Sequence, residues 1–251
     1  MSGQKITALV TGASSGLGAE FCRQLAARCD VIIAVARRGE RLLALAEELA
    51  GTVEMHCLEA DLQSIEGVAR TMEAIRQQGP VTILVNNAGF GALGHFDTLP
   101  IEGQRAMINL HIDTSVTLCR AAIPFMRECG GGSIINVSSL ASFVSGEGRA
   151  VYGASKVFLN YYSQALQVEL AGSGIEVQAL CPGFTRTEFH DGMTKETFDP
   201  DRVPPQFWMT SEDVVSASLE ALGSGQVLVV PSEASREVAR RGLQQQLDSL
   251  Q

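Results

Sequence analysis

Tyr152 and Lys156 form the pair of residues whose types and spacing most directly suggest chemistry. They stand four positions apart in Tyr152-Gly153-Ala154-Ser155-Lys156, and in a helix both side chains would lie on the same face. A tyrosine of ordinary pKa, about 10, is seldom ionised at neutral pH, whereas a neighbouring ammonium favours the phenolate and lowers that pKa. The pair therefore predicts a tyrosine that exchanges a proton with a substrate oxygen near neutral pH.

Two adjacent hydroxyl residues, Ser138 and Ser139, follow a predicted strand and precede the tyrosine. A serine hydroxyl placed beside the reacting carbon can hydrogen-bond a carbonyl or alcohol oxygen as charge develops on it. Either serine fits this role by position alone. We prefer Ser139, because its spacing from Tyr152 matches a family pattern.

A glycine-rich turn, Thr11-Gly12-Ala13-Ser14-Ser15-Gly16-Leu17-Gly18, lies between a predicted strand and a predicted helix. Glycines let the backbone approach a pyrophosphate closely, and the helix N-terminus offers unpaired N–H groups and a positive partial charge. The spacing differs from G-x-G-x-x-G, so a purely structural turn is the alternative. The strand-to-helix position favours a dinucleotide site.

The elements that must position these residues alternate along the chain. Short β-branched runs indicate strands at Ile6 to Val10, Val31 to Val35, Val53 to Leu58, Val81 to Val85, Ser133 to Val137, Ile175 to Leu180 and Val227 to Val230. The stretches between them indicate helices, including Leu17 to Arg28, Arg41 to Leu49 and Ile65 to Gln77. Strands joined by helical crossovers pair in parallel. The sequence therefore predicts a Rossmann-type α/β fold, a doubly wound parallel sheet of about seven strands with helices on both faces and a ligand site beyond the carboxyl ends of the strands.

The length of 251 residues is typical of one domain spanning residues 1–251, because α/β domains of this size are commonly undivided. Two stretches interrupt the alternation of strands and helices. Residues 184–210 are predicted to form a substrate-covering loop, and the polar tail, residues 232–251, is predicted to form a surface helix.

Charge and composition argue against several classes of partner. With 19 Lys and Arg against 28 Asp and Glu, the net charge is −9, which repels nucleic acids and anionic membranes. No apolar run reaches the roughly 20 residues that span a bilayer. The cysteines form no C-x-x-C pair and no leader opens the chain, so we expect buried thiols and a cytoplasmic location. No cluster of His, Cys and carboxylates has metal-ligand spacing, and we expect no catalytic metal.

Taken in order, the motifs resemble those of the short-chain dehydrogenase/reductase superfamily. T-G-x-x-x-G-x-G begins at Thr11, Asn86-Asn87-Ala88-Gly89 follows the fourth strand, Tyr152 and Lys156 match Y-x-x-x-K, and Pro182-Gly183 follows the sixth strand. The glycine pattern and the length are typical of the compact, single-domain branch. The resemblance implies an enzyme that transfers a hydride between a nicotinamide dinucleotide and a ketone, an aldehyde or an alcohol.

The resemblance also implies roles for individual residues. Tyr152 is the general acid/base, and Ser139 stands at the family's spacing from it. Asn109 helps to hold a water beside Lys156, which also binds the nicotinamide ribose. The implied cofactor contacts are Thr11, Gly12, Ser14, Ser15, Gly16, Leu17, Gly18, Arg37, Arg38, Asp61, Leu62, Asn87, Ala88, Gly89, Tyr152, Lys156, Pro182, Gly183, Thr185 and Thr187. Among these, Asp61 and Leu62 resemble an adenine-contacting pair, although Asp61 would also serve as a helix N-cap.

The choice of cofactor depends on Ala36-Arg37-Arg38, which stands where an NAD-preferring relative carries an Asp or Glu for the ribose 2′-OH. Arg37 can pair with a 2′-phosphate through charge-assisted hydrogen bonds, and Ser15 can add a hydroxyl donor. We therefore expect NADP(H) rather than NAD(H). The alternative is that Arg37 and Arg38 are solvated residues at the start of the next helix.

The substrate is specified least. Residues 184–210 offer apolar side chains that would cover a lipophilic molecule, namely Phe184, Phe189, Met193, Phe198, Phe207, Trp208 and Met209. Packing of this segment on its own domain explains them equally well. Further candidates for the pocket are His95, Phe96 and His190.

Two other functions stay open. One is a ketoacyl-thioester reductase: the acidic net charge argues against docking an acidic carrier protein, unless a local Arg120/Arg127 patch provides the contact. The other is a non-catalytic NADP-sensing regulatory protein, against which the intact Ser139, Tyr152 and Lys156 argue. Family resemblance further suggests a homodimer or homotetramer packed through helices around residues 101–128 and 150–171.

Overall fold

The core of the fold is a seven-stranded parallel sheet, seen in a computed structural model that describes residues 5–191 and 198–250. The strands lie in the order β3-β2-β1-β4-β5-β6-β9, and all neighbours pair in parallel. Their bounds are β1 Thr7–Thr11, β2 Val31–Ala36, β3 Glu54–Glu59, β4 Val81–Asn86, β5 Gly132–Val137, β6 Ile175–Leu180 and β9 Leu228–Val229. The predicted Rossmann-type sheet is confirmed.

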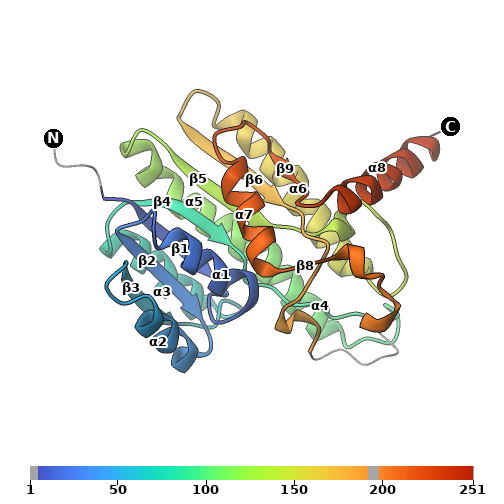
Figure 1. The fold of residues 1–251 in the computed structure, drawn as a ribbon, viewed down its shortest axis with the longest axis horizontal. Helices are drawn as coiled ribbons and strands as arrows, with labels where there is room; N and C mark the ends of the chain where they lie inside the picture. Colours follow the sequence, from blue (N-terminus) through green and yellow to red (C-terminus); the bar gives the residue numbers. More distant parts are fainter. Residues whose placement is uncertain (1–4, 192–197, 251) are drawn as a thin grey trace.

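Helices cover both faces of this sheet (Figure 1). One face carries α1 Gly16–Leu25, α2 Gly39–Glu48 and α7 Ser211–Ala221, and the other carries α3 Ile65–Gln77, α5 Thr114–Glu128 and α6 Ala150–Glu169. Successive strand residues point to opposite faces. Ala8 and Val10 of β1 accordingly pack on the α1 side and Leu9 on the α5 side. Because both faces are covered, β2 is apolar along its whole length, and polar residues such as Asn136 of β5 and Gln178 of β6 are buried.

A long helical segment precedes β5. It consists of α4 Ile101–Ile108, a π-helical turn over Asn109–Asp113, and α5. Such turns are rare and often occur at functional sites. No helix among residues 5–191 and 198–250 is both long and apolar enough to cross a membrane.

The strand order reverses between β1 and β4, which are adjacent and parallel. Ligands of open α/β sheets bind in the crevice outside the carboxyl ends of the strands at such a reversal. Thr11 ends β1 and Asn86 ends β4. The topology therefore brings the glycine turn and the Asn-Asn-Ala-Gly motif together at this edge.

The segment 184–210, predicted to be a loop, contains regular elements in its described residues. Its described part contains a pair of short parallel strands, β7 Phe184–Thr185 and β8 Trp208–Met209, and 3-10 turns at Glu188–His190, Pro200–Arg202 and Pro205–Phe207. The polar tail forms α8 Glu233–Asp248, which projects from the body in Figure 1. Buried Ser235, Ala239 and Gly242 fix one side of α8 to the domain.

Candidate active site

Tyr152, Lys156 and Ser139 come together at the carboxyl end of β5. Tyr152 and Lys156 lie one turn apart on α6, and Ser139 caps a short 3-10 turn that follows β5. The Ser139 side chain lies beside Tyr152, and Lys156 Nζ lies 5.7 Å from the centroid of the Tyr152 ring. The structure thus joins three residues that the sequence separates.

The two adjacent serines make different contacts. Ser138 is buried, and its hydroxyl donates to the Lys156 carbonyl oxygen at 2.9 Å. Ser139 is half-buried, and its Oγ accepts a hydrogen bond from the Ala141 N–H at 3.1 Å. Ser138 therefore fixes α6 against the sheet, whereas Ser139 is the hydroxyl beside Tyr152.

Burial governs the two titratable groups of this site. It raises the pKa of Tyr152, which the hydrogen bond with Ser139 and the charge of Arg149 only partly offset. It lowers the pKa of Lys156 to about 8. The prediction that an ammonium lowers the pKa of Tyr152 is wrong for this site, because burial outweighs the nearby charges. Lys156 Nζ is directed to the Val137 carbonyl oxygen, to which it donates at 2.9 Å.

Asn109 opens the π-helical turn rather than contacting Lys156 with its side chain. Its amide Nδ2 donates to the Gln63 carbonyl oxygen at 3.0 Å. Its own carbonyl oxygen accepts from the Thr114 N–H, the bond that defines the π-helical turn. The predicted role of Asn109 in holding a water stays a prediction.

His111, which sequence reasoning missed, lies buried beside the candidate site. Its Nε2 accepts a hydrogen bond from the Phe90 N–H at 3.2 Å, and its Nδ1 lies 2.9 Å from Ser155 Oγ. Ser155 Oγ in turn donates to the Tyr152 carbonyl oxygen at 2.7 Å. Burial, supported by the charge of Lys156, lowers the pKa of His111 to about 2. No spacing in the sequence could have linked His111 to Ser155, because the contact joins separate elements.

The glycine turn is shaped for close approach. Gly12 and Gly16 have positive φ angles of 66° and 53°, which other residues rarely adopt. A Cβ on Gly18 would lie 2.2 Å from the Gly12 carbonyl oxygen and 2.6 Å from Asn87 Nδ2. Leu17 packs against the hydrophobic core and so anchors the turn.

Thr11 joins the turn to the Asn-Asn-Ala-Gly motif. Its Oγ1 accepts hydrogen bonds from the Asn87 and Ala88 N–H groups at 2.9 and 3.0 Å. Asn87 Nδ2 returns a hydrogen bond to the Thr11 carbonyl oxygen at 2.9 Å. Gly89 follows beside His111, whose Nε2 would lie 2.8 Å from a Cβ at that position.

Arg38, rather than Arg37, lies against the glycine turn. Its guanidinium donates to Ser14 Oγ at 3.2 Å and to Ser15 Oγ at 2.7 Å. Arg37 is exposed and forms no hydrogen bond or ion pair within the described residues. Ser15 is the N-cap of α1 but makes no capping hydrogen bond, so the first N–H groups of α1 are free to bind an anion.

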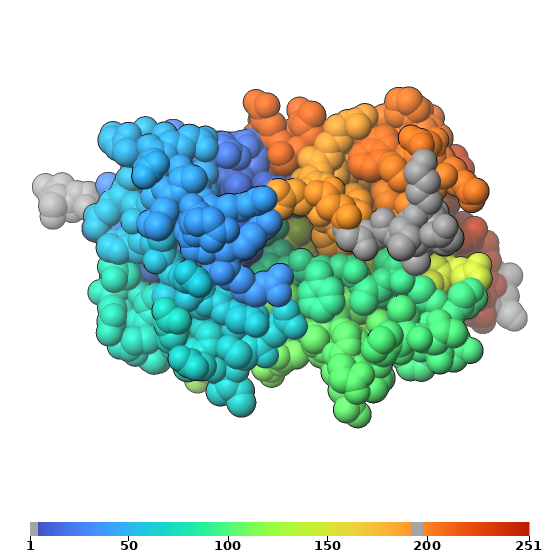
Figure 2. All heavy atoms as spheres, turned by 90° about the horizontal axis from the view of Figure 1, so that it is seen from below, coloured from blue at the N-terminus to red at the C-terminus, as the bar shows by residue number. Residues whose placement is uncertain are grey.

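Glu188 reaches this turn from the segment after β7. Its carboxylate pairs with Arg38 Nη1 at 2.9 Å and forms a short contact with Arg41 Nη1. The neighbouring Thr187 lies 3.2 Å from the position of a Cβ on Gly16. In Figure 2 the blue residues near 40 and the light-orange residues near 188 lie side by side next to a hollow.

The expected adenine pair, Asp61 and Leu62, follows β3. Leu62 is buried in the core, and exposed Asp61 accepts a hydrogen bond at Oδ1 from the Gln63 N–H. The additional role expected of Asp61, as N-cap of the next helix, is wrong. Ser64 is the N-cap of α3, since its Oγ accepts from the Gly67 N–H at 3.0 Å.

The remaining expected cofactor residues continue from β6 along the same edge. Buried Pro182 accepts a hydrogen bond from the Leu140 N–H through its carbonyl oxygen. Gly183 packs against Ser235 at the base of α8. Thr185 is buried in β7, and Thr187 caps the 3-10 turn that carries Glu188.

Phe184, Phe198 and Trp208 of the segment 184–210 pack on one another, and Met209 packs against the main core. Phe184 and His190 each stack on Phe198, at ring-centroid distances of 5.7 and 4.3 Å, and Trp208 lies against all three. Phe189 differs, because it is 39% exposed and its ring centroid lies 6.1 Å from that of Tyr152. Packing of the segment on itself is therefore observed, the substrate-covering role stays a prediction, and Phe189 is the ring of the segment that contacts Tyr152. Met193 lies outside the described residues.

The other histidine named from the sequence, His95, is exposed and pairs with Glu147 at 3.0 Å. Phe96 is also exposed. Within residues 5–191 and 198–250, no three His, Cys, Asp or Glu side chains gather so as to hold a metal ion. The absence of a catalytic metal stays a prediction.

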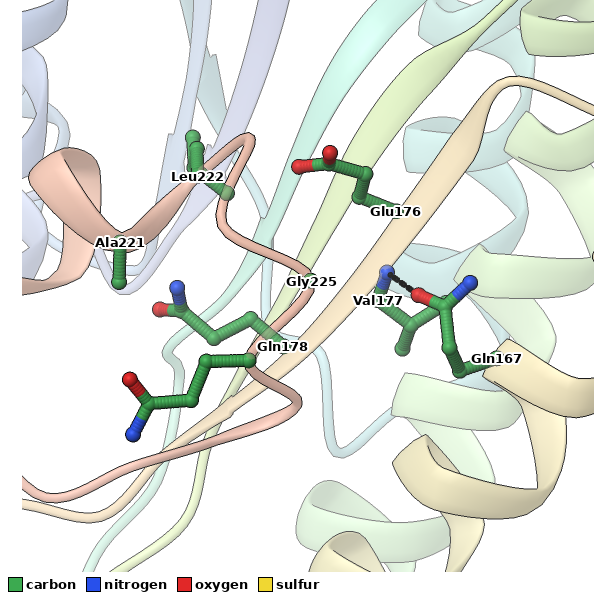
Figure 3. A pocket seen from close by; sticks show the side chains of 8 residues that line it. Gln167, Glu176, Val177, Gln178, Ala221, Leu222 and Gly225 are labelled. Atoms are coloured by element: carbon green, nitrogen blue, oxygen red, sulfur yellow. Dashed lines mark hydrogen bonds between the residues drawn. The ribbon is translucent and has the colours of Figure 1, made fainter.

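A small cavity far from these residues carries no comparable chemistry. Figure 3 shows it beside the amino end of β6, where Gln167 Oε1 accepts a hydrogen bond from the Val177 N–H at 2.7 Å. Its volume of about 10 Å³ holds at most one water.

The turn and its surroundings fit a phosphorylated dinucleotide. Gly12 and Gly18 leave a cradle that a Cβ would fill, and the α1 N-terminus and Arg38 direct positive charge into it. The hydroxyl groups of Tyr152 and Ser139 lie at the same edge of the sheet. Fold and site together define the class, a Rossmann-type oxidoreductase.

Comparisons with known proteins agree with this class. A family model described as short chain dehydrogenase matches residues 6–197. A protein of Myxococcus xanthus described as an uncharacterized oxidoreductase is 34% identical over 221 residues, 87% of this chain and 83% of that protein. Sulfoacetaldehyde reductase 2 of Chromohalobacter salexigens is 36% identical over 187 residues, 72% of this chain and 73% of that protein.

A solved structure is similar over nearly the whole chain. The short-chain dehydrogenase from Sphingobium yanoikuyae in complex with NADPH has a TM-score of 0.83 and 34% identity, covering 97% of this chain and 95% of that one. This protein belongs to the short-chain dehydrogenase family.

Proposed function

We propose that this protein is an NADP(H)-dependent oxidoreductase that interconverts a ketone or aldehyde and an alcohol, with Tyr152 as general acid/base. The observation that carries the proposal is the placement of Ser139 and Lys156 beside Tyr152, at the edge of the sheet that carries the glycine turn. The relatives support the cofactor and the reaction, since one was solved with NADPH and another is named a sulfoacetaldehyde reductase.

The N-terminus of α1 and the cradle at Gly12 and Gly18 hold the pyrophosphate of the cofactor. Arg38 and Ser15 hold its 2′-phosphate through charge-assisted hydrogen bonds. The bound nicotinamide supplies or accepts the hydride. The cofactor roles of Thr185, Thr187 and the other residues named from the family rest on resemblance.

Tyr152 and Ser139 bind the substrate oxygen through their hydroxyl groups. In the reducing direction both donate to the carbonyl oxygen, and Tyr152 passes its proton to that oxygen as negative charge develops. Burial raises the pKa of Tyr152, so at neutral pH the phenol carries the proton that carbonyl reduction needs. The Lys156 ammonium stabilises the phenolate that remains.

The substrate carries an apolar group beside its carbonyl. Phe189 is the exposed aromatic side chain next to Tyr152, with their ring centroids 6.1 Å apart. Apolar walls with few polar groups are typical of small-molecule sites. The protein works as one domain, in the cytoplasm and without a catalytic metal.

The test is NADPH consumption by the purified protein over a panel of ketones, aldehydes, quinones and ketoacyl thioesters. We expect turnover of apolar ketones or aldehydes, and none by a Tyr152→Phe variant. Turnover of ketoacyl thioesters alone would favour the carrier-linked reductase. NADPH binding without turnover of any compound would contradict the proposal and favour the sensing protein.

A further inference from the structure

Glu188 places a carboxylate between two guanidinium groups at the nucleotide-binding turn. It pairs with Arg38, which follows β2, and with Arg41 on α2. Arg38 also donates to Ser14 and Ser15, the hydroxyl residues of the turn. The two arginines lower the pKa of Glu188 to about 2, so the carboxylate is charged throughout the physiological range.

These ion pairs join segments far apart in the sequence. Glu188 lies 150 positions after Arg38 and 147 after Arg41, so the contact is not local helix capping. Thr187, the preceding residue, packs against Gly16 in the turn. An anion supplied by the protein itself therefore occupies the basic site beside the turn.

We propose that Glu188 is a specificity-determining residue for the cofactor. Its carboxylate pairs with the Arg38 guanidinium, the group that the 2′-phosphate of NADP(H) requires. This inference rests on the proposed contact between Arg38 and the 2′-phosphate. Carboxylates and phosphates are both bound by guanidinium groups through paired N–H donors.

Two anions at one site repel each other, so the incoming phosphate must displace Glu188 or bind beside its charge. In either case, nucleotides with a 2′-phosphate bind more weakly than they would to the two arginines without Glu188. NADH has no 2′-phosphate and leaves the pairs intact. Glu188 therefore reduces the preference for NADP(H) that Arg38 creates.

The test compares nucleotide affinities of wild type and Glu188→Gln by calorimetry. The substitution keeps the side-chain size and removes the charge. We expect NADPH and adenosine 2′,5′-bisphosphate to bind the variant about 3- to 10-fold more tightly, the range set by two exposed ion pairs. NADH should bind both proteins equally. Glu233→Gln is the matched control, since Glu233 also bridges two arginines, Arg236 and Arg240, but on α8.

Arg38→Ala separates this inference from the proposed function. If Arg38→Ala leaves NADPH affinity unchanged, the proposed 2′-phosphate contact is wrong. If Arg38→Ala weakens NADPH binding, the contact is supported. Glu188→Gln should then tighten NADPH binding less in the Arg38→Ala variant than in wild type. Weaker or unchanged NADPH binding by Glu188→Gln, or an equal change for NADH, would overturn it.

Discussion

His111 Nδ1 lies 2.9 Å from Ser155 Oγ, a contact that ties the π-helical turn between α4 and α5 to α6, the helix that carries Tyr152. The other ring nitrogen, Nε2, accepts from the Phe90 N–H directly after the Asn-Asn-Ala-Gly motif. An accepting Nε2 means that Nδ1 carries the proton and donates to Ser155. A neutral His111 thus aligns three segments around Tyr152.

The first prediction concerns the pH dependence of stability. Because the pKa of His111 is lowered to about 2 in the folded protein, only the unfolded chain takes up a proton at this residue as pH falls below about 6.5. Stability should therefore fall by up to about 1.4 kcal/mol per pH unit below that value, and none of this contribution should be lost above it. Urea unfolding of wild type and His111→Gln at pH values from about 5 to about 8, on either side of the ordinary histidine pKa of about 6.5, measures how the free energy of unfolding changes with pH.

His111→Gln should be less stable at pH 8 but show a flatter pH dependence. His95→Gln, at an exposed histidine, is the control and should keep the wild-type slope. The same slope in His111→Gln and wild type would assign the acid sensitivity to another group.

The second prediction concerns Tyr152→Phe. The substitution removes the proton-transferring oxygen and little volume, so kcat/KM should fall by about 10²- to 10⁴-fold while NADPH affinity and Tm stay near wild type. Tyr161→Phe, on the same helix but 75% exposed, should retain activity. Near-normal turnover by Tyr152→Phe on an established substrate would remove Tyr152 from its role.

The third prediction separates the two neighbouring arginines. Sequence reasoning favoured Arg37, whereas the structure places Arg38 against Ser14 and Ser15. Arg38→Ala should therefore reduce the ratio of kcat/KM for NADPH over NADH by about 10- to 100-fold. Arg37→Ala should change it less. The kcat/KM ratios of both variants are measured at matched ionic strength. A larger fall in Arg37→Ala than in Arg38→Ala would assign the 2′-phosphate contact to Arg37.

The fourth prediction concerns Gly18→Ala. The new Cβ would collide with the Gly12 carbonyl oxygen and Asn87 Nδ2, so the turn must distort. We expect a loss of about 1 to 3 kcal/mol in the free energy of unfolding and severely weakened NADPH binding. Gly103→Ala in α4, where a Cβ meets nothing within 4 Å, should retain both. Full NADPH affinity in Gly18→Ala would contradict the proposed pyrophosphate cradle.

The fifth prediction concerns assembly. Ile101 and Ile108 on α4 and Val157, Tyr161 and Val168 on α6 are exposed, as expected if these helices form a homodimer or homotetramer interface. Light scattering at micromolar concentration should show an oligomer. A Val157→Arg/Tyr161→Arg variant should shift it towards monomer, and Leu43→Arg on α2 should not. A monomeric wild type would reject the interface.

The sequence by itself determined the sheet and the order of its motifs. Short runs rich in β-branched and apolar residues are typical of strands in a covered parallel sheet, and each strand of the main sheet begins and ends within one residue of its predicted bounds. The Tyr152–Lys156 pair and the glycine turn are likewise local patterns, since one helical turn or one strand-to-helix turn fixes their geometry.

Only the tertiary structure decided contacts between segments remote in the chain. The direction of the Tyr152 pKa shift depends on burial, which the spacing to Lys156 does not contain. The contact of His111 with Ser155 and the pairing of Glu188 with Arg38 and Arg41 join elements that meet only once the sheet has formed. A sequence lists the charges and hydroxyls available, but packing decides which of them lose water and face one another.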